Sequence, residues 1–211
     1  MIGEPDADHE NPGKLYGEVV VELKRRKLLR LKDYDYSQAG GYFLTICTHG
    51  RKTMFGEIID GEMRLSSFGD IVKACWEELP HHYQNIQLDE FVVMPNHVHG
   101  IIIIFDDDMV RAGLRPAPTG GKPYPLSEIV RAFKSFSARG INALRNTPGV
   151  PVWQRNYFEH VIRSEKSLHR IQEYIIDNAM RWDFDRENSE SGAIDEFEAW
   201  LMIEGTKRPK T

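Results

Sequence analysis

The chain has 211 residues, which suits one domain or at most two small ones. Hydrophobic residues make up 41% and charged residues 28%, as in a globular protein, so the composition excludes a chain that is disordered throughout. With 32 acidic and 27 basic residues the net charge is −5, which argues against a general nucleic-acid coat protein.

No stretch resembles a membrane span or a secretion signal. The densest apolar run, 101–105, is too short to cross a bilayer, and residues 1–6 lack the apolar core of a signal peptide. Cys47 and Cys75 have no partner at metal-site spacing and suit reduced thiols. These features predict a cytoplasmic protein that does not bind membranes.

The N-terminal region divides into two parts. Residues 1–15 are polar and acidic and predict a disordered lead-in. Residues 24–32 then place six bases in nine positions, beginning with Lys24, Arg25 and Arg26. This run is either the solvated face of an arm or a phosphate-binding arm.

The first half of the chain predicts one strand, a hairpin and a helix. Residues 41–48 are rich in β-formers and predict a strand. Asp60-Gly61 predicts a hairpin between 55–58 and 63–65. Ser67 begins a capping-box pattern, after which apolar residues recur at helical spacing until Pro80 ends the helix.

The second half continues with strands at 86–94 and 97–105, joined by the turn Pro95-Asn96. Residues 106–125 are rich in Asp, Pro and Gly and predict a flexible connection or lid. The pattern then predicts a helix from 126, a strand at 152–162, a helix from Ser164 to about Trp182, and a short amphipathic helix with Ile194, Phe197 and Leu201.

This order predicts an α+β fold, a ferredoxin-like β-α-β-β-α-β antiparallel sheet with an added β-hairpin and a C-terminal tyrosine-bearing helix. Two helices would cover one face of the sheet, leaving the other face for a partner or another helix.

The charge is unevenly distributed along the chain. Residues 109–181 contain twelve Lys and Arg against five Asp and Glu, whereas residues 182–211 contain four against eight. A basic segment of this kind is expected of a surface that meets phosphates.

The most specific motif is the run Val92–Gly100, which contains His97 and His99. Side chains alternate along a strand, so both imidazoles would lie on one face and could meet one metal ion. Isolated histidines are more often surface or core residues, and this alternative stays open.

The second motif lies on the helix that follows Ser164. Its apolar stripe contains Ile171 and Ile175, Asn178 falls close to the centre line of the stripe, and Tyr174 lies four residues before Asn178. A buried amide needs partners, so Asn178 is either the cap of a helix end or a functional ligand.

Together these motifs resemble a known family, the single-tyrosine HUH transposases, and most of all the transposases associated with repetitive extragenic palindromes (REP) in bacteria. The resemblance covers roughly residues 24 to 187 and also includes the runs 34–40 and 153–163. It implies an enzyme that cleaves and rejoins single-stranded DNA through a 5′-phosphotyrosine intermediate. By the same resemblance His97, His99 and Asn178 are metal ligands and Tyr174 is the nucleophile.

One departure from the family pattern concerns Asn178. Relatives often have Pro after this residue, whereas here Ala179 follows, so we expect the helix to continue past the site. The cofactor implied is a divalent metal, Mg²⁺ or Mn²⁺; imidazoles alone would also accept Zn²⁺.

Further candidates for DNA binding are Arg155, Tyr157 and Arg163, together with the basic arm. Aromatic rings beside arginines suit stacked bases and phosphate contacts, although a core or rim role is the alternative. His160 lies in the same run. The partner expected is single-stranded DNA with hairpin-forming repeats, bound by a monomer or homodimer.

The sequence thus predicts three regions: residues 1–35 as lead-in and basic arm, 36–182 as the catalytic domain, and 183–211 as an acidic tail with a short helix. Two other functions remain possible. One is a domesticated regulator that binds hairpin DNA without cleavage, and the other is a metal-dependent hydrolase, which the lack of clustered carboxylates after the His-x-His motif disfavours.

Overall fold

A computed structural model describes residues 38–105, 124–188, 191 and 196–206. The predictions for the lead-in, the basic arm with Lys24, Arg25 and Arg26, and almost all of the 106–125 connection lie outside these residues. In the described part, a four-stranded sheet has the order β4-β5-β1-β6. Its strands are β1 (Gly40–Cys47), β4 (Ile86–Met94), β5 (His97–Ile104) and β6 (Phe158–Ile162).

All neighbouring strands in this sheet are antiparallel. Helix α1 (Ser67–Glu77) connects β1 to β4, and helix α4 (Leu126–Leu144) lies between β5 and β6 in the chain. The order of strands and helices is the β-α-β-β-α-β arrangement that the sequence predicts. The predicted hairpin is also present, as β2 (Gly56–Ile59) and β3 (Glu62–Leu65), and its turn places Asp60 and Gly61 at φ values of 53° and 77°.

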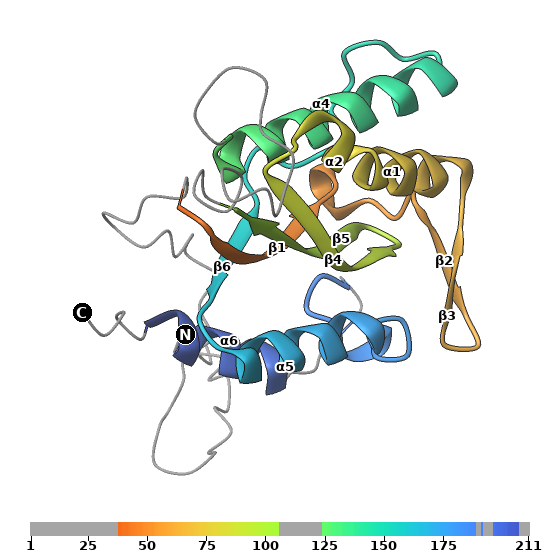
Figure 1. Ribbon diagram of the computed structural model, residues 1–211. Helices are drawn as coiled ribbons and strands as arrows, with labels where there is room; N and C mark the ends of the chain where they lie inside the picture. Colours follow the sequence, from red (N-terminus) through yellow and green to blue (C-terminus); the bar gives the residue numbers. More distant parts are fainter. Residues whose placement is uncertain (1–37, 106–123, 189–190, 192–195, 207–211) are drawn as a thin grey trace, which may run out of the picture.

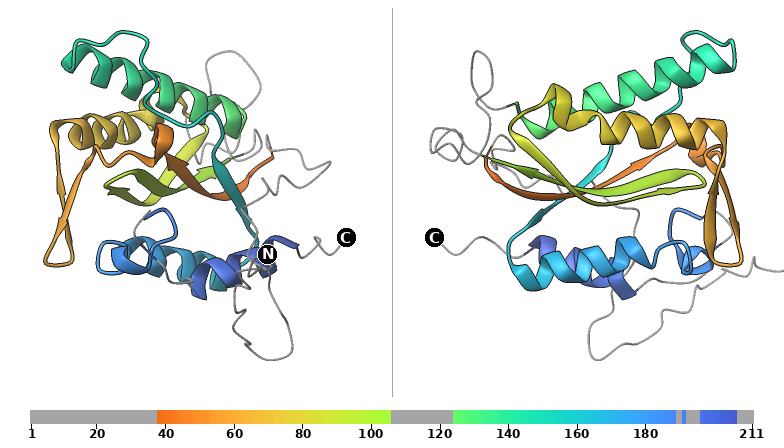
Figure 2. Two further views of the ribbon diagram at one scale, coloured as in Figure 1. Left: turned by 180° about the vertical axis from the view of Figure 1, so that it is seen from behind. Right: turned by 45° about the vertical axis from the view of Figure 1, so that its right-hand side comes forward.

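Helices cover both faces of the sheet (Figures 1 and 2). Helices α1 and α4 lie on one face, next to the short α2 (Leu79–His82). Helices α5 (Glu165–Ile176) and α6 (Glu196–Thr206) lie on the other face, which the sequence left to a partner or another helix. The 3₁₀ turns η1 (His49–Arg51) and η2 (Trp182–Phe184) complete the described elements. No helix among the described residues is both long and apolar enough to cross a membrane.

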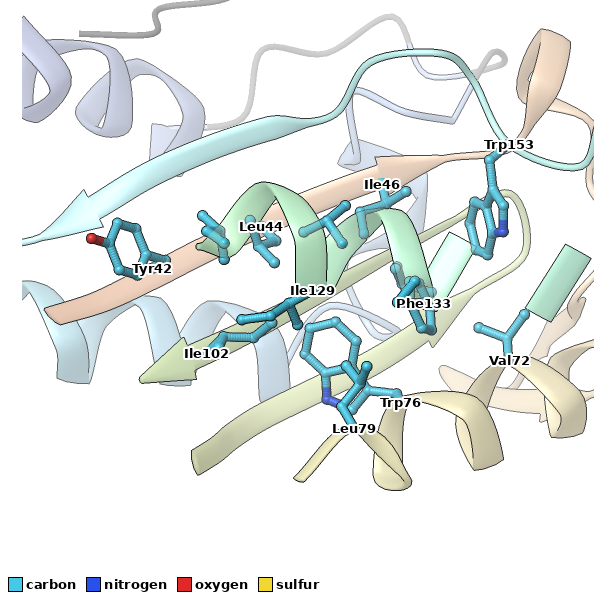
Figure 3. Close-up of a cluster of buried hydrophobic side chains, with 14 of the residues drawn as sticks. Tyr42, Leu44, Ile46, Val72, Trp76, Leu79, Ile102, Ile129, Phe133 and Trp153 are labelled. Carbon is cyan, nitrogen blue, oxygen red and sulfur yellow. The ribbon is translucent and has the colours of Figure 1, made fainter. Parts of the chain in front are cut away.

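A first hydrophobic core fills the space between the sheet and α1 and α4 (Figure 3). Trp76 stacks on Phe91 at a centroid distance of 4.5 Å and meets Phe133 edge-on at 5.3 Å. Gly100 permits this packing, because a Cβ at this position would lie only 2.5 Å from the Trp76 ring. The alternating residues of β1 and β5 that join this core are Tyr42, Leu44, Ile46, Val98, Ile102 and Ile104.

A second core lies between the sheet and α5 and α6. It contains Phe43 and Ile101 from the strands and Ile171, Tyr174, Ile175, Phe197 and Leu201 from the helices. Because side chains alternate along β5, His97 and His99 share the face of Ile101 and point toward α5. The period-two pattern therefore fixes which helix the histidines meet.

Four local predictions are wrong. The helix cap is Ser66, whose hydroxyl accepts from the amide of Gly69, and not Ser67. That helix, α1, ends at Glu77, and Pro80 lies within α2 instead of ending the longer helix. The predicted strand 152–162 begins only at Phe158, because Trp153 is buried through a single bridge to Thr48 and an indole hydrogen bond to Ser137.

The fourth concerns helix α5, which ends at Ile176 instead of Trp182, since Asp177 closes it and a series of turns follows.

Some residues beyond Trp182 are buried, whereas an acidic tail is expected to be exposed to solvent. Asp185 and Phe197 are 2% and 3% exposed and pack beneath the sheet.

Candidate active site

His97 and His99 lie at the start of β5, just after the Pro95-Asn96 turn, and both are buried. Their Nε2 atoms are 3.0 Å apart. The opposite ring nitrogens have partners, since His97 Nδ1 lies 2.8 Å from Asn96 Oδ1 and His99 Nδ1 lies 3.0 Å from Thr45 Oγ1. Such partners fix the orientation of an imidazole, and here they aim both Nε2 atoms at one point.

Asp185 completes this cluster and was not indicated by the sequence. Its Oδ2 lies 3.6 Å from His97 Nε2 and 3.9 Å from His99 Nε2. Its Oδ1 accepts a 2.6 Å hydrogen bond from the amide of Glu187. The segment that carries it comes from the turns after α5, where the polar sequence alone suggests a solvated break.

Among the described residues, His97, His99 and Asp185 form the group of ligating side chains that could hold a metal ion, with their donor atoms within 4.8 Å of one another. The buried Oδ2 of Asp185 accepts no hydrogen bond from any residue that the structure describes. A buried carboxylate oxygen without a donor, facing two imidazole nitrogens, fits a divalent cation.

The electrostatics of Asp185 agree with this arrangement. Burial by itself would raise the pKa of the carboxyl group. The charge of His97, the interaction with His99 and the amide of Glu187 outweigh burial and hold the pKa of Asp185 well below its ordinary value. The carboxylate is therefore ionised at neutral pH and is available as a ligand.

Tyr174 on α5 reaches the same cluster. Its hydroxyl oxygen lies 3.4 Å from His99 Nε2, and the side chain is 3% exposed. Phe197 of α6 stacks on the phenol ring at a centroid distance of 3.7 Å with an interplanar angle of 7°. The structure thus brings Tyr174 to the histidines, beneath a covering aromatic ring.

Asn178 is buried in the turn after α5, at 1% exposure. Neither of its amide atoms has a hydrogen-bond partner among the residues described. The expectation that the helix continues past this residue is wrong, because α5 ends two residues earlier. Its role as a metal ligand stays a prediction, and Asp185 supplies a carboxylate that the prediction lacked.

Comparisons with known proteins support the resemblance. No family model matches the chain. Over 172 residues the chain is 40% identical to an uncharacterized protein of Haemophilus influenzae, across 78% of this chain and 93% of that protein. The chain belongs to the same family as this Haemophilus protein.

A second protein of Haemophilus influenzae bears the name "Putative REP-associated tyrosine transposase". It is 22% identical over 151 residues, which are 70% of this chain and 74% of that protein. The resemblance to the REP-associated tyrosine transposases is confirmed by this match.

Two solved structures are also similar. One is a REP-associated tyrosine transposase bound to a REP hairpin, with a TM-score of 0.49 and 17% identity over 72% of this chain and 73% of that chain. The other is named a "putative transposase" from Deinococcus radiodurans, with a TM-score of 0.40 and 20% identity over 70% and 96% of the two chains.

The remaining candidate residues lie near β6. Arg155 and Arg163 are exposed, and Arg163 donates to the carbonyl of Glu204 at 3.1 Å. Tyr157 is half-buried and packs against the first core. His160 is buried on β6, where burial and the nearby Arg163 lower its pKa to about 4.

Besides Asp185, the sequence did not indicate a functional role for Asn96 or Phe197. Asn96 appeared only as a turn residue, although its position next to His97 is a signal for a supporting role. Phe197 appeared only as an apolar residue of a short helix, and its stacking on Tyr174 depends on a contact between distant parts of the chain.

Proposed function

We propose that the protein cleaves and rejoins single-stranded DNA, with Tyr174 as the nucleophile and a divalent metal ion held by His97, His99 and Asp185. The observation that carries this proposal is the 3.4 Å separation between the Tyr174 hydroxyl and His99 Nε2, inside a cluster of ligating groups. A phenol beside two imidazoles and a carboxylate suits transfer of a phosphoryl group to the tyrosine.

The covalent chemistry follows from the phenol. The Tyr174 oxygen attacks the phosphorus of a DNA phosphodiester and loses its proton as the bond to the 3′ oxygen breaks. The 3′ oxygen takes up a proton, which leaves a 5′-phosphotyrosine and a free 3′-hydroxyl. A 3′-hydroxyl can attack the phosphotyrosine in reverse, so strands are rejoined without ATP.

A bound divalent ion would supply positive charge against the negative charge that develops on the phosphate. Two imidazoles and a carboxylate would hold Mn²⁺ or Mg²⁺, the ions implied by the family resemblance. Asn178 is a further proposed ligand, because its amide is buried and without a hydrogen-bond partner in the described structure.

Access to Tyr174 requires movement of residues that cover it. In the structure the phenol is 3% exposed, and Phe197 covers one face of its ring. A phosphodiester has to contact the phenolic oxygen directly, so residues that cover Tyr174 must move before DNA can react, and Phe197 of α6 is one of these residues. The conformation described is therefore a closed one.

The DNA proposed as substrate is a single strand with hairpin-forming repeats. The support is the family resemblance, together with the similar Haemophilus protein that is named a REP-associated tyrosine transposase. The basic arm with Lys24, Arg25 and Arg26 would contact phosphates, as would Arg155 and Arg163 on either side of β6, and Tyr157 would stack on a base. We further propose a bacterial cytoplasmic protein that acts as a monomer or homodimer, with a catalytic domain that begins near residue 36 and extends past residue 182 to include Asp185.

A second candidate is a regulator that binds hairpin DNA without cutting it, and the burial of Tyr174 is the observation that favours it. The deciding experiment incubates the protein with a hairpin-bearing single strand and Mn²⁺, then separates products on a denaturing gel. We expect a covalent adduct with the wild type, none with Tyr174→Phe, and an unchanged yield with Tyr157→Phe. Binding without any adduct would favour the regulator, and an adduct retained by Tyr174→Phe would move the nucleophile elsewhere.

A further inference from the structure

Asn96 makes contacts at both ends of its side chain, in the turn between β4 and β5. Its Oδ1 lies 2.8 Å from His97 Nδ1. Its Nδ2 donates to the backbone carbonyl of Glu187 at 2.7 Å and to that of Arg51 at 3.4 Å. The residue is 1% exposed, so water does not replace these partners. One amide thus joins a candidate metal ligand to the segment that contains Asp185.

The two carbonyl partners determine the orientation of this amide. A carbonyl oxygen only accepts hydrogen bonds, so the NH₂ group of Asn96 must face Glu187 and Arg51. The amide oxygen then faces His97, and this oxygen also only accepts. His97 Nδ1 must therefore carry the proton, which in the neutral imidazole leaves the lone pair on Nε2, the atom that faces His99 and Asp185.

The Asp185 segment is held in place by the same set of contacts. The amide of Glu187 donates to Asp185 Oδ1 at 2.6 Å, while its carbonyl accepts from Asn96. The Glu187 carboxylate pairs with Arg51 at 2.9 Å and accepts from the Cys47 thiol at 3.3 Å. Asn96 belongs to this set, and its side-chain oxygen also lies within hydrogen-bond distance of His97 Nδ1.

We propose that Asn96 is a positioning residue that fixes the tautomer of His97 and, through Glu187, the place of Asp185, so that both ligands face one metal ion. This inference rests on the proposed metal site. Asn suits the task because it offers an acceptor and a donor on one short side chain. Asp would keep the acceptor for His97 and lose the donor to Glu187, and Ala would lose both.

The test measures Mn²⁺ affinity by calorimetry at pH 8 without DNA. Loss of a partner that orients a metal ligand weakens metal binding about 10- to 100-fold, and we expect this for Asn96→Ala. The matched control is Asn142→Ala, because Asn142 is also buried and donates to a carbonyl, that of Val150 at 2.9 Å. This control should lower stability and leave Mn²⁺ affinity unchanged.

The same substitutions made in an Asp185→Asn variant separate the effect of Asn96 on His97 from its effect on Asp185. In the Asp185→Asn protein, adding Asn96→Asp should change Mn²⁺ affinity little, because the lost hydrogen bond to Glu187 weakens Mn²⁺ binding only by displacing Asp185. Adding Asn96→Ala to the same protein should still weaken Mn²⁺ binding, because it also removes the acceptor for His97. Equal Mn²⁺ affinities of Asn96→Ala and Asn142→Ala would overturn the inference. So would equal effects of Asn96→Asp in both backgrounds.

Nitrogen NMR of His97 in metal-free protein provides a measurement that needs no ion. We expect a protonated Nδ1 in the wild type and a shift toward the Nε2-protonated form in Asn96→Ala. A wild-type His97 protonated at Nε2 would refute the inference. Neither measurement uses DNA, so a failure of strand cleavage would count against the proposed function alone.

Discussion

Replacing Asn178 by Leu should stabilise the metal-free protein. The Asn178 side chain is 1% exposed, and neither amide atom has a hydrogen-bond partner among the described residues. Burying an unpaired amide costs about 1–3 kcal/mol. Leu has the same branching at Cγ, so most of this cost should be recovered. For a protein of this size each kcal/mol corresponds to roughly 2–4 °C, which gives a rise in melting temperature of about 2–10 °C.

Bound Mn²⁺ should reverse this order of stability and make the wild type more stable than Asn178→Leu. If Asn178 is a ligand, an ion that binds only the folded protein stabilises the wild type by about 3 kcal/mol at one hundred times its dissociation constant. The Leu variant binds more weakly and gains less. Thermal unfolding is therefore followed in chelator and in a Mn²⁺ series, for wild type and variant.

The matched control is Asn142→Leu, at a buried amide that has partners. Asn142 donates to the Val150 carbonyl and accepts from Arg145 Nε, both at 2.9 Å. This variant should lose about 1–3 kcal/mol in chelator and in Mn²⁺ alike. If Asn178→Leu destabilised the metal-free protein as much as the control does, the amide would be satisfied in solution and the reasoning would fail. Equal Mn²⁺ responses of wild type and Asn178→Leu would remove Asn178 from the metal site.

Three further predictions concern acid stability, access and DNA binding. The pKa of His160 is lowered to about 4, so the unfolded chain takes up this proton first, and stability should fall by roughly 3 kcal/mol between pH 6.5 and 4. His160→Phe should remove most of this loss in unfolding curves measured above pH 4.5, and an unchanged pH slope would contradict the assignment. Phe197→Ala should raise the initial rate of adduct formation while lowering the melting temperature, and a rate no higher than that of the wild type would show that α6 does not limit access. Neutralising Arg155 and Arg163 should lower the slope of log K against log salt by about one for each phosphate that the variant no longer binds, and an unchanged slope would leave both as solvated residues.

The fold could be predicted because its signals are local. Alternation along 97–104 and helical spacing along 126–144 depend only on neighbours in sequence, and both elements form where expected. The shared face of His97 and His99 follows from the same alternation. Predictions failed where burial arises without a regular element. Val152 and Trp153 are buried as irregular backbone, so their apolar character was mistaken for a strand.

Asp185 could not be predicted, because nothing local distinguishes it from the other acids after Trp182. Its environment comes from residues about 90 to 140 positions away. Asn96 binds the Glu187 carbonyl, and Arg51 and Cys47 bind the Glu187 carboxylate. A pattern of acidic residues normally indicates a solvated surface, and only these long-range contacts bring this carboxylate to two imidazoles.

The proposed function makes different demands on the segment 185–188 and on α6, which follows it in the chain. In this proposal Asp185 stays beside His97, while Phe197 moves off Tyr174 to expose the phenol to DNA. The contacts that hold residues 185–188 are shorter than the ion pair that joins this segment to α6. Asn96 and Arg51 hold residues 185–188 through several short bonds, whereas the Arg186–Glu198 ion pair, which joins this segment to α6, is longer at 3.7 Å. The Arg186–Glu198 pair shares no atoms with the contacts that hold Asp185, so weakening this pair would loosen α6 and leave the ligand in place. Arg186→Ala should then speed adduct formation without changing Mn²⁺ affinity, and a parallel loss of Mn²⁺ affinity would show that the segment and the helix move together.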